Sequence, residues 1–187
     1  MKWLLVAVVS LVALVLAALL ALYLLRFRDG AGRIEHSIEI DRPASDVWRW
    51  LVEPEKQKRW VSWLTEVHEH GAGGPGPGAE VTWILIDPTM NDQRVEIHAE
   101  YTAFEPARLS ALRLESPGMF TGTVRYELTD LDDGRTQLRH VGEFEYRTAF
   151  ARLFEPLVTP QARRKAVDDV GRLKSLAEAE PAGRGAA

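Results

Sequence analysis

The sequence of 187 residues contains no cysteine. The chain therefore has no disulfide, no thiolate nucleophile and no cysteine ligand for zinc or an iron–sulfur cluster, and cysteine usage says nothing about the redox compartment. It also has no Gly-x-Ser-x-Gly or His-Glu-x-x-His motif. The glycine-rich stretch over residues 71–78 lacks the Gly-Lys-Ser/Thr ending of a phosphate loop and opens no helix. We expect no hydrolase nucleophile, no nicotinamide chemistry and no cofactor.

Positive charge is also scarce. The chain has 23 Lys plus Arg against 27 Asp plus Glu, a net charge of −4, and its longest basic run is Arg163-Arg164-Lys165. Non-specific affinity for nucleic acid needs a clustered positive footprint that neutralises phosphates. Nucleic acid is therefore excluded as an expected partner.

The sequence contains one long apolar run. From Trp3 to Leu25 there are 23 residues, of which only Ser10 is not apolar and none is charged. As a helix this block would extend roughly 34 Å, enough for a hydrocarbon core of about 30 Å. A cleaved secretory signal usually has a shorter apolar region and ends in an Ala-x-Ala-like site, which is missing here. We predict an uncleaved, single-pass transmembrane helix over 3–25.

The flanking charges give only a weak indication of orientation. Lys2 and the α-amine precede the apolar block, while Arg26, Arg28 and Arg33 follow it, with Asp29 among them. The positive-inside rule favours a cytoplasmic location for the rest of the chain by about one charge. A short hinge is expected over 26–32.

The 162 residues after Leu25 have the size of one domain with a sizeable core. Ile34, His36, Ile38 and Ile40 alternate with polar residues, which predicts a half-buried strand. From about residue 64 to 146, short β-type segments are separated by turn residues, and no intervening helix is long enough to connect parallel neighbours. Connections this short join antiparallel strands in a meander.

Helical spacing appears in three further places. Pro43 precedes a short helix that carries Val47 and Trp48, and Pro54 ends it and starts a second one. Trp50 falls on the more polar side of the first helix, where it is available to contact a bilayer. After interruptions at Pro156 and Pro160, an amphipathic helix of about 20 residues closes the domain, with Thr159 placed to cap it. A disordered tail is expected over 180–187.

The order of these elements, together with several short motifs, is similar to a known superfamily. The segment Ser37 to Trp48 resembles its first strand running into a Pro-x-x-x-Val-Trp helix, and Pro54-Glu55, Arg59-Trp60 and Leu173-Lys174 resemble it too. The chain therefore resembles the START-like polyketide cyclase/dehydratase and lipid transport superfamily, often called SRPBCC, over residues 33–179. The transmembrane helix lies outside the shared domain.

This resemblance implies an α+β helix-grip fold. A curved antiparallel sheet of about seven strands would wrap around the long C-terminal helix, with two short helices after the first strand. An apolar cavity between sheet and helix is the default ligand site. Taking the apolar phase of each strand as inward, we expect the cavity to be lined by Trp83, Tyr101, Tyr126, His140, Phe144, Tyr146, Val170 and Leu173.

Two histidines are candidates for chemistry. The resemblance makes the first and last strands neighbours, so His36 and His140 are expected close together, where they could exchange protons with help from Tyr101 or Tyr126. The alternative is that both are core histidines with ordinary partners. No confident catalytic residue follows from the sequence.

A metal site is not expected. His68 and His70 point to the same side of one strand and could be joined by Glu66 or His98, but nothing in the sequence converges three or four ligands. A solvated strand face explains them better. The Gly71 to Gly78 stretch reads as a connection between strands, with gating of the cavity as the less favoured role.

Three functions remain open. The leading hypothesis is a membrane-anchored module that binds a hydrophobic small molecule, of the lipid, quinone or polyketide-like kind. The second is a cyclase/dehydratase-type enzyme, and the third is a protein-interaction module similar to chaperone activators, whose sign would be an exposed apolar patch outside the cavity. The ligand, the oligomeric state and the pathway do not follow from the sequence.

Overall fold

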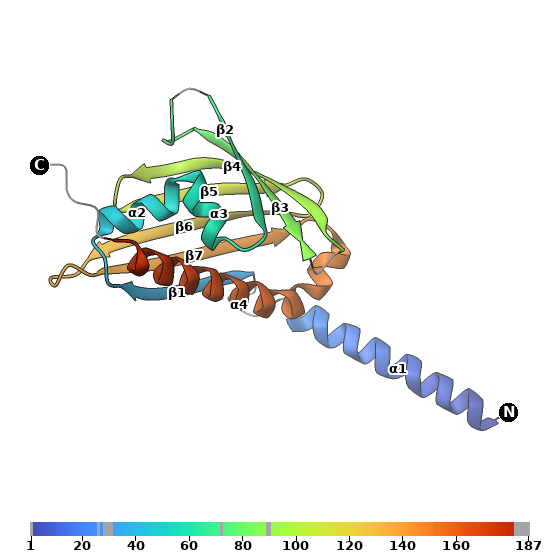
Figure 1. The fold of residues 1–187 in the computed structure, drawn as a ribbon. Coiled ribbons are helices and arrows are strands. Elements are labelled where there is room, and N and C mark those ends of the chain that lie inside the picture. Colours follow the sequence, from blue (N-terminus) through green and yellow to red (C-terminus); the bar gives the residue numbers. More distant parts are fainter. Residues whose placement is uncertain (1, 26, 28–31, 72, 89–90, 182–187) are drawn as a thin grey trace, which may run out of the picture.

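The computed structural model describes residues 2–25, 27, 32–71, 73–88 and 91–181. In these residues the elements follow one another as α1 (Lys2–Leu25), β1 (Arg33–Ile40), α2 (Ala44–Val52), α3 (Pro54–Trp60), β2 (Leu64–His70), β3 (Glu80–Asp87), β4 (Gln93–Glu105), β5 (Leu109–Ser116), β6 (Phe120–Asp130), β7 (Thr136–Tyr146) and α4 (Ala149–Ala179) (Figure 1). The predicted hinge over 26–32 and tail over 180–187 lie outside the described residues, except for residues 27, 32, 180 and 181.

The described strands form one seven-stranded antiparallel sheet in the order β1-β7-β6-β5-β4-β3-β2. Strands β2 to β7 pair with their neighbours in sequence, as short turns require, and β1 pairs with β7. The sheet curves so that one face meets α2, α3 and α4 and the other faces away (Figure 1). This is the helix-grip arrangement that was predicted, with the first and last strands as neighbours.

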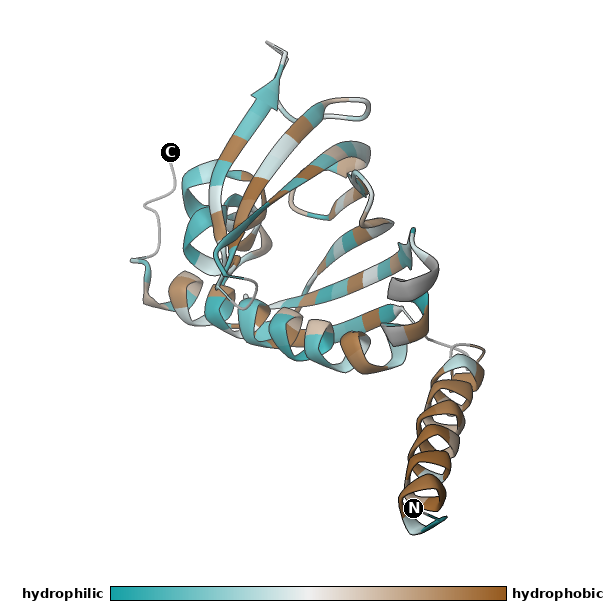
Figure 2. Ribbon diagram, turned by 90° about the vertical axis from the view of Figure 1, so that its right-hand side faces the viewer, coloured by the Kyte–Doolittle hydropathy of each residue, from teal (hydrophilic) through white to brown (hydrophobic). Residues whose placement is uncertain are grey.

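Helix α1 stands apart from the rest of the fold. It is the one described helix long and apolar enough to cross a membrane, and none of its residues is buried. Figure 2 shows it as an almost uniformly hydrophobic rod leading away from the domain. Secretory signals share the apolar character of α1, but their apolar region is usually about 7–15 residues, shorter than the 24 residues of this helix.

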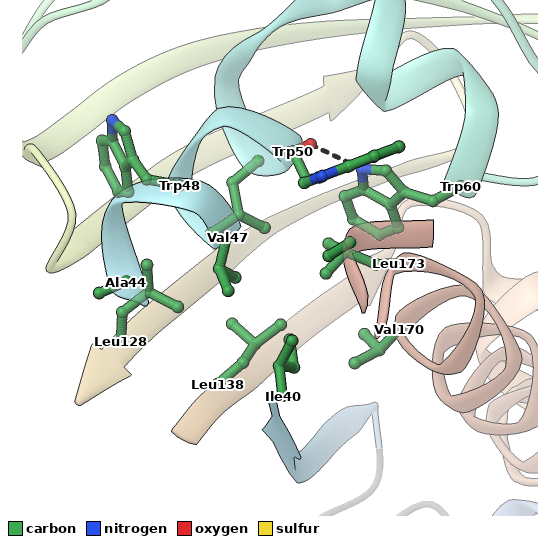
Figure 3. Packing of buried hydrophobic residues seen from close by; sticks show 12 residues of the cluster. Ile40, Ala44, Val47, Trp48, Trp50, Trp60, Leu128, Leu138, Val170 and Leu173 are labelled. Atoms are coloured by element: carbon green, nitrogen blue, oxygen red, sulfur yellow. Dashed lines mark hydrogen bonds between the residues drawn. The ribbon is translucent and has the colours of Figure 1, made fainter. Parts of the chain in front are cut away.

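Helices α2 and α3 close one end of the inner face of the sheet. Their contacts, with those of α4, build a packed cluster that we define by its buried members Ile40, Ala44, Val47, Trp48, Trp50, Leu51, Trp60, Leu128, Leu138, Val170, Leu173 and Ala177 (Figure 3). Ile40, Leu138 and Leu173 have no exposed surface. Close packing of this kind leaves little room for a ligand.

Trp50 corrects one expectation. The sequence suggested that it could contact a bilayer, but its side chain is 1% exposed. The indole nitrogen of Trp60 donates a hydrogen bond to the Trp50 carbonyl at 2.7 Å, and the Lys56 ammonium lies 4.3 Å from the Trp50 ring centre (Figure 3). Because α3 folds back on α2, it covers the face that a helical projection of α2 alone leaves exposed.

Helix α4 is longer than predicted. It contains 31 residues and includes Pro156 and Pro160, where the sequence had placed the start of a shorter helix at Thr159 and Pro160. Each proline removes one backbone donor, and such positions bend a helix without ending it when tertiary contacts hold both sides. Figure 1 shows the first turns of α4 at an angle to the remainder.

The end of α4 is held in place by charged groups. The Lys56 ammonium, with its side chain 10% exposed, lies 2.6 Å from a Glu180 carboxylate oxygen, and the Arg42 guanidinium donates to the Glu180 carbonyl at 2.8 Å. The Lys56 ammonium lowers the pKa of Glu180. The ordered domain thus includes Glu180, which had been assigned to the tail.

The outer face of the sheet carries ion pairs between strands. Arg139 of β7 pairs with Glu35 of β1 at 2.6 Å and with Glu127 of β6 at 2.7 Å. Hydrogen bonds from the Arg139 guanidinium lower the pKa of both carboxyls. Exposed pairs of this kind contribute little individually, so the outer face keeps the sheet soluble and in register rather than holding it together.

Candidate functional site

A small cavity lies between the inner face of the sheet and α3. Its volume is about 60 Å³, and it is lined by Leu51, Gln57, Trp60, Val61, Leu64, Trp83, Tyr101, Leu112 and Tyr126. The strands supply alternate residues to it, since Trp83, Tyr101, Leu112 and Tyr126 all point to the inner face. Pockets for drug-sized ligands usually measure at least 300 Å³, so this cavity holds only one end of such a molecule.

The position of the cavity differs from the expected one. Its covering residues come from α2, α3 and the turn after α3, whereas α4 was expected to cover it. Val170 and Leu173 of α4 were predicted to contact ligand, but they are 1% and 0% exposed inside the packed cluster. Helix α4 packs mainly on β1 and β7, while α3 contacts the edge strand β2 and reaches Tyr126 of β6 through Trp60.

Three of the predicted ligand-binding residues line the cavity directly. Trp83, Tyr101 and Tyr126 come from β3, β4 and β6 and supply most of its aromatic surface. Burial raises the pKa of Tyr101 to about 12, and burial also raises the pKa of Tyr126. Both hydroxyls therefore stay protonated at neutral pH, where they act as hydrogen-bond donors and not as bases.

His140 lies directly behind Tyr126. The two residues are register partners on β7 and β6, and their rings stack with centroids 4.9 Å apart and planes 14° apart. Trp60 meets the same tyrosine edge-on at 6.1 Å. The aromatic rings thus form a row on the inner face of the sheet, from α3 across β6 to β7, and such contacts fix the orientation of the tyrosine.

The two candidate histidines face each other across β1 and β7. His36 is the register partner of His140, which confirms their expected proximity. Burial is the main cause that lowers the pKa of His140 to about 4, and the neighbouring His36 adds to it. The Nδ1 atom of His140 is buried without a hydrogen-bond partner among the described residues. At neutral pH this imidazole is uncharged and is a weak base.

Two polar atoms of cavity-lining residues are unpartnered. The Oε1 atom of Gln57 and the Nε1 atom of Trp83 are buried and make no hydrogen bond within the described part of the chain. The amide nitrogen of Gln57 donates to the Leu51 carbonyl at 2.6 Å, which fixes the side chain. A buried donor or acceptor without a partner costs free energy, so this donor and this acceptor are a signature of polar recognition.

The remaining predicted residues lie farther along the inner face. Phe144 contacts Phe120 with ring centroids 5.7 Å apart, and its ring leaves no room for a Cβ on Gly122 or Gly142. Tyr146, the register partner of Phe120, is half-buried at the end of β7. Neither residue lines the cavity, although Phe144 packs against an open cluster that we define as Val81, Ile97, Ala99, Tyr101, Leu112, Leu114 and Val124.

The turn between α3 and β2 forms one wall of the cavity through Val61 and Leu64. Between them, Trp63 has a φ of 74°, a left-handed conformation that bulky residues rarely adopt. Its carbonyl accepts a hydrogen bond from the Ile86 amide at 2.9 Å, and the Ser62 amide donates to buried Asp169 at 3.1 Å. The wall is therefore tied to both β3 and α4.

The remaining histidines lie on the outer face of the sheet. His70 Nε2 and His98 Nδ1 lie 2.8 Å and 3.3 Å from the Thr82 hydroxyl, while His68 pairs with Glu66 at 2.8 Å. They border a shallow hollow of about 710 Å³ over β2 to β5. Among the described residues no group of three or more His, Asp or Glu side chains is placed to hold a metal ion.

Sequence reasoning missed six of the nine cavity-lining residues. Gln57 gave no signal, because a polar residue on a short charged helix is usually exposed. Leu51, Val61 and Leu64 were visible as apolar residues, but their position over the sheet depends on how α3 folds back.

The sheet, its two short helices and the closing helix define the helix-grip class of fold. A family model described as polyketide cyclase/dehydrase and lipid transport matches residues 31–178. The chain belongs to this family. None of the curated proteins compared with it matches.

Solved structures share the fold at low sequence identity. An aromatase/cyclase, Zhui, from Streptomyces sp. R1128 is 22% identical with a TM-score of 0.62, over 78% of this chain and 93% of that one. A conserved protein from Geobacillus kaustophilus is 16% identical with a TM-score of 0.64, over 78% and 94%. The protein CV1439 from Chromobacterium violaceum is 12% identical with a TM-score of 0.62, over 80% and 99%. At these identities the likeness concerns the fold alone.

Proposed function

We propose that the domain binds an apolar small molecule, of the lipid, quinone or polyketide-like kind, by an oxygen-bearing end. The observation that carries this proposal is that two residues lining an aromatic cavity each have a buried polar atom without a partner among the described residues, the Trp83 N–H donor and the Gln57 carbonyl acceptor. A hydroxyl group accepts from the first and donates to the second. Membership in a family of cyclases, dehydrases and lipid carriers supports it.

The rest of the ligand lies along the inner face of the sheet. Beside the open cluster, the side chains of Leu85, Val95, Phe120 and Phe144 are only half-buried. An apolar chain or ring that binds on this surface would remove from water apolar side chains that are partly exposed in the free domain. The small cavity then fixes one end of a larger molecule.

A fluorescent alkanol and its methyl ether test this binding mode. The ether keeps the acceptor and loses the donor, so the full-length chain should bind the alcohol about five- to tenfold more tightly, the worth of one buried hydrogen bond. Gln57→Leu should abolish this preference, while Gln137→Leu on the exposed face of β7 should keep it. Failure of both probes to bind, with no small molecule retained in native mass spectrometry, would refute the proposal.

We further propose that α1 is an uncleaved single-pass anchor with the domain on the cytoplasmic side. Its length, its lack of buried residues and the aromatic residues Trp3 and Tyr23 near its ends support the anchor. The charge margin that favours the cytoplasm is about one. The intact mass of the chain purified from membranes should include residues 2–25, and a reporter fused after Ala187 should be active in the cytoplasm only.

A cyclase/dehydratase-type reaction is a second candidate. It is favoured by one observation, the Tyr126 hydroxyl in the cavity with His140 stacked behind it. Protonated Tyr126 and Tyr101 would polarise a substrate carbonyl, and a neutral His140 would orient Tyr126. A pH-dependent turnover that disappears in both Tyr126→Phe and His140→Phe would establish this candidate, and unchanged turnover would exclude these residues from it.

A protein-interaction module is less well supported. Its expected sign was an exposed apolar patch outside the cavity. Among described residues beyond α1, the exposed large apolar side chains are Phe27, Leu157 and Val158; they lie outside the cavity, but on residue 27 and α4 and not on the outer face of the sheet, where this module would act. That face carries ion pairs and histidines instead.

A further inference from the structure

Exposed apolar side chains of the domain gather at one place. Apart from α1, the large apolar residues that are exposed in the described chain are Phe27 at 66%, Leu157 at 51% and Val158 at 39%. Phe27 follows α1 directly, and its ring meets that of Tyr23 at 5.5 Å. Leu157 and Val158 belong to the first half of α4, and α4 contacts α1. All three therefore belong to segments at the junction of the domain with its N-terminal helix: residue 27 follows α1, and Figure 2 shows the C-terminal end of α1 close to α4.

Arginines without acidic partners lie beside them. Arg163 and Arg164 are exposed, and neither forms an ion pair within the described residues, although Arg163 donates a long hydrogen bond to the Arg33 carbonyl at 3.4 Å. Leu157 and Arg164 are seven residues apart, so they share one face of α4. On the outer face of the sheet, by contrast, arginines such as Arg139 are paired with glutamates.

We propose that Phe27, Leu157, Val158, Arg163 and Arg164 form a membrane-contact surface that rests on an anionic bilayer. The inference depends on α1 being the proposed anchor. A helix of 24 residues extends about 36 Å and therefore places its C-terminal end at the headgroup level of a bilayer whose core is about 30 Å thick. Apolar side chains at this level insert into the boundary with the acyl chains, and guanidinium groups bind lipid phosphates.

The contact between α1 and α4 makes this surface continuous with the anchor. Gly32, with φ of 72°, lies so close to the domain that a Cβ there would be 2.6 Å from the Phe144 carbonyl oxygen and 2.7 Å from a Glu155 oxygen. The Gly32 carbonyl also accepts a hydrogen bond from the Phe144 amide at 3.0 Å. The chain is thus fixed against β7 and the first turns of α4 only seven residues after α1 ends, which holds this side of the domain against the bilayer.

The surface lies on the same side as the half-buried aromatic end of the sheet. Phe144 is the residue that Gly32 contacts, and Phe144 with Phe120 forms the floor proposed for the apolar part of the ligand. An apolar molecule leaving the bilayer would therefore reach the domain without crossing the bulk solvent.

Depth-dependent quenching tests the surface, because a cysteine-free chain accepts single labels. Three variants of the full chain, Leu157→Cys on the surface, Leu14→Cys within α1 and Asp133→Cys in the turn between β6 and β7, would carry a fluorophore in vesicles of phosphatidylcholine and phosphatidylglycerol. Lipids with a spin label near the headgroup should quench Leu157→Cys, those labelled near the chain end should quench Leu14→Cys, and neither should quench Asp133→Cys. Val158→Cys repeats the first measurement should Leu157→Cys fail to fold.

The outcomes separate the two proposals. Quenching at Leu14 without quenching at Leu157 or Val158 would overturn the surface and leave the anchor standing. No quenching at Leu14 would overturn the anchor, and the surface with it. In the Leu157→Cys background, Arg163→Glu with Arg164→Glu should remove most of the difference between anionic and neutral vesicles. Arg108→Glu, at the turn between β4 and β5, should leave that difference unchanged.

Discussion

The packed cluster and the open cluster cover the same face of the same sheet, but different elements lie over them. Helices α2, α3 and α4 press on the packed cluster, so that Ile40, Leu138 and Leu173 retain no exposed surface. The open cluster is flanked by side chains that are only half-buried, among them Leu85 and Phe144. One half of the inner face is thus closed by helices, and the other half is flanked by apolar side chains that are only half-buried.

Leucine truncation should separate the two halves most strongly. Leu138→Ala removes a fully buried side chain and should lower the free energy of unfolding by about 2–5 kcal/mol. Leu85→Ala beside the open cluster should cost about 1 kcal/mol or less, because its side chain is already partly hydrated. Urea unfolding of the full chain in detergent, followed by tryptophan fluorescence, measures both. Equal losses would contradict the distinction between the clusters.

Acid should weaken the domain through His140. The pKa near 4 in the folded state is below the ordinary value of 6.5, so between these values the unfolded chain binds a proton that the folded chain does not. The contribution of His140 to the free energy of unfolding is therefore fully present above pH 6.5. It decreases as the pH falls towards 4, by at most about 3 kcal/mol. His140→Phe should flatten this part of the stability profile, whereas carboxylates such as Glu127 with lowered pKa act mainly below it. An unchanged slope in the variant would show that His140 is not the responsible group.

Glycine substitution should disturb the aromatic floor of the open half. A Cβ on Gly142 would lie 2.9 Å from the Phe144 ring, so Gly142→Val should cost about 1–3 kcal/mol and weaken binding of the fluorescent alkanol. Gly171→Ala in α4 is the matched control, since nothing lies within 4 Å of its added Cβ. That substitution should stabilise the helix by up to about 1 kcal/mol. Unaltered probe binding in Gly142→Val would show that Phe144 does not support the ligand.

The smallest effect is expected at the edge of the packed half. Glu180→Gln removes the carboxylate that pairs with Lys56, and partly exposed pairs of this kind contribute about 1 kcal/mol or less. The loss should shrink as salt is added, because screening weakens the same pair in the parent chain. A loss that does not depend on salt would mean that packing of the Lys56 stem on Trp50, rather than charge, holds the chain end.

Most of the fold could be predicted from the sequence, because its signals are local. The alternation in Ile34 to Ile40 and the turn residues between strands predict the strands, and the resemblance supplied the pairing that sets His36 opposite His140. How the helices pack on one another could not be predicted from the sequence. Trp50 is buried because α3 folds over it, and α4 starts ten residues early because packing tolerates Pro156 and Pro160.

The candidate site was predictable only in part, for the same reason. Alternation on single strands identified Trp83, Tyr101 and Tyr126, whose inward direction depends on the strand alone. Gln57 lines the cavity because of the angle between α2 and α3. Val170 and Leu173 do not line it, because α4 packs on β1 and β7. These positions depend on how elements pack, which a single strand or helix does not encode.

The left-handed backbone at Trp63 has a kinetic consequence. The backbone of the wall between Val61 and Leu64 is fixed by the Trp63 carbonyl, which accepts from the Ile86 amide, and by the Ser62 amide, which donates to the Asp169 carboxylate, so opening the wall requires backbone motion. Side-chain rotation takes picoseconds to nanoseconds, whereas loop and collective backbone rearrangements extend from nanoseconds to milliseconds. Exchange of the proposed ligand past this wall would therefore require the slower backbone motion.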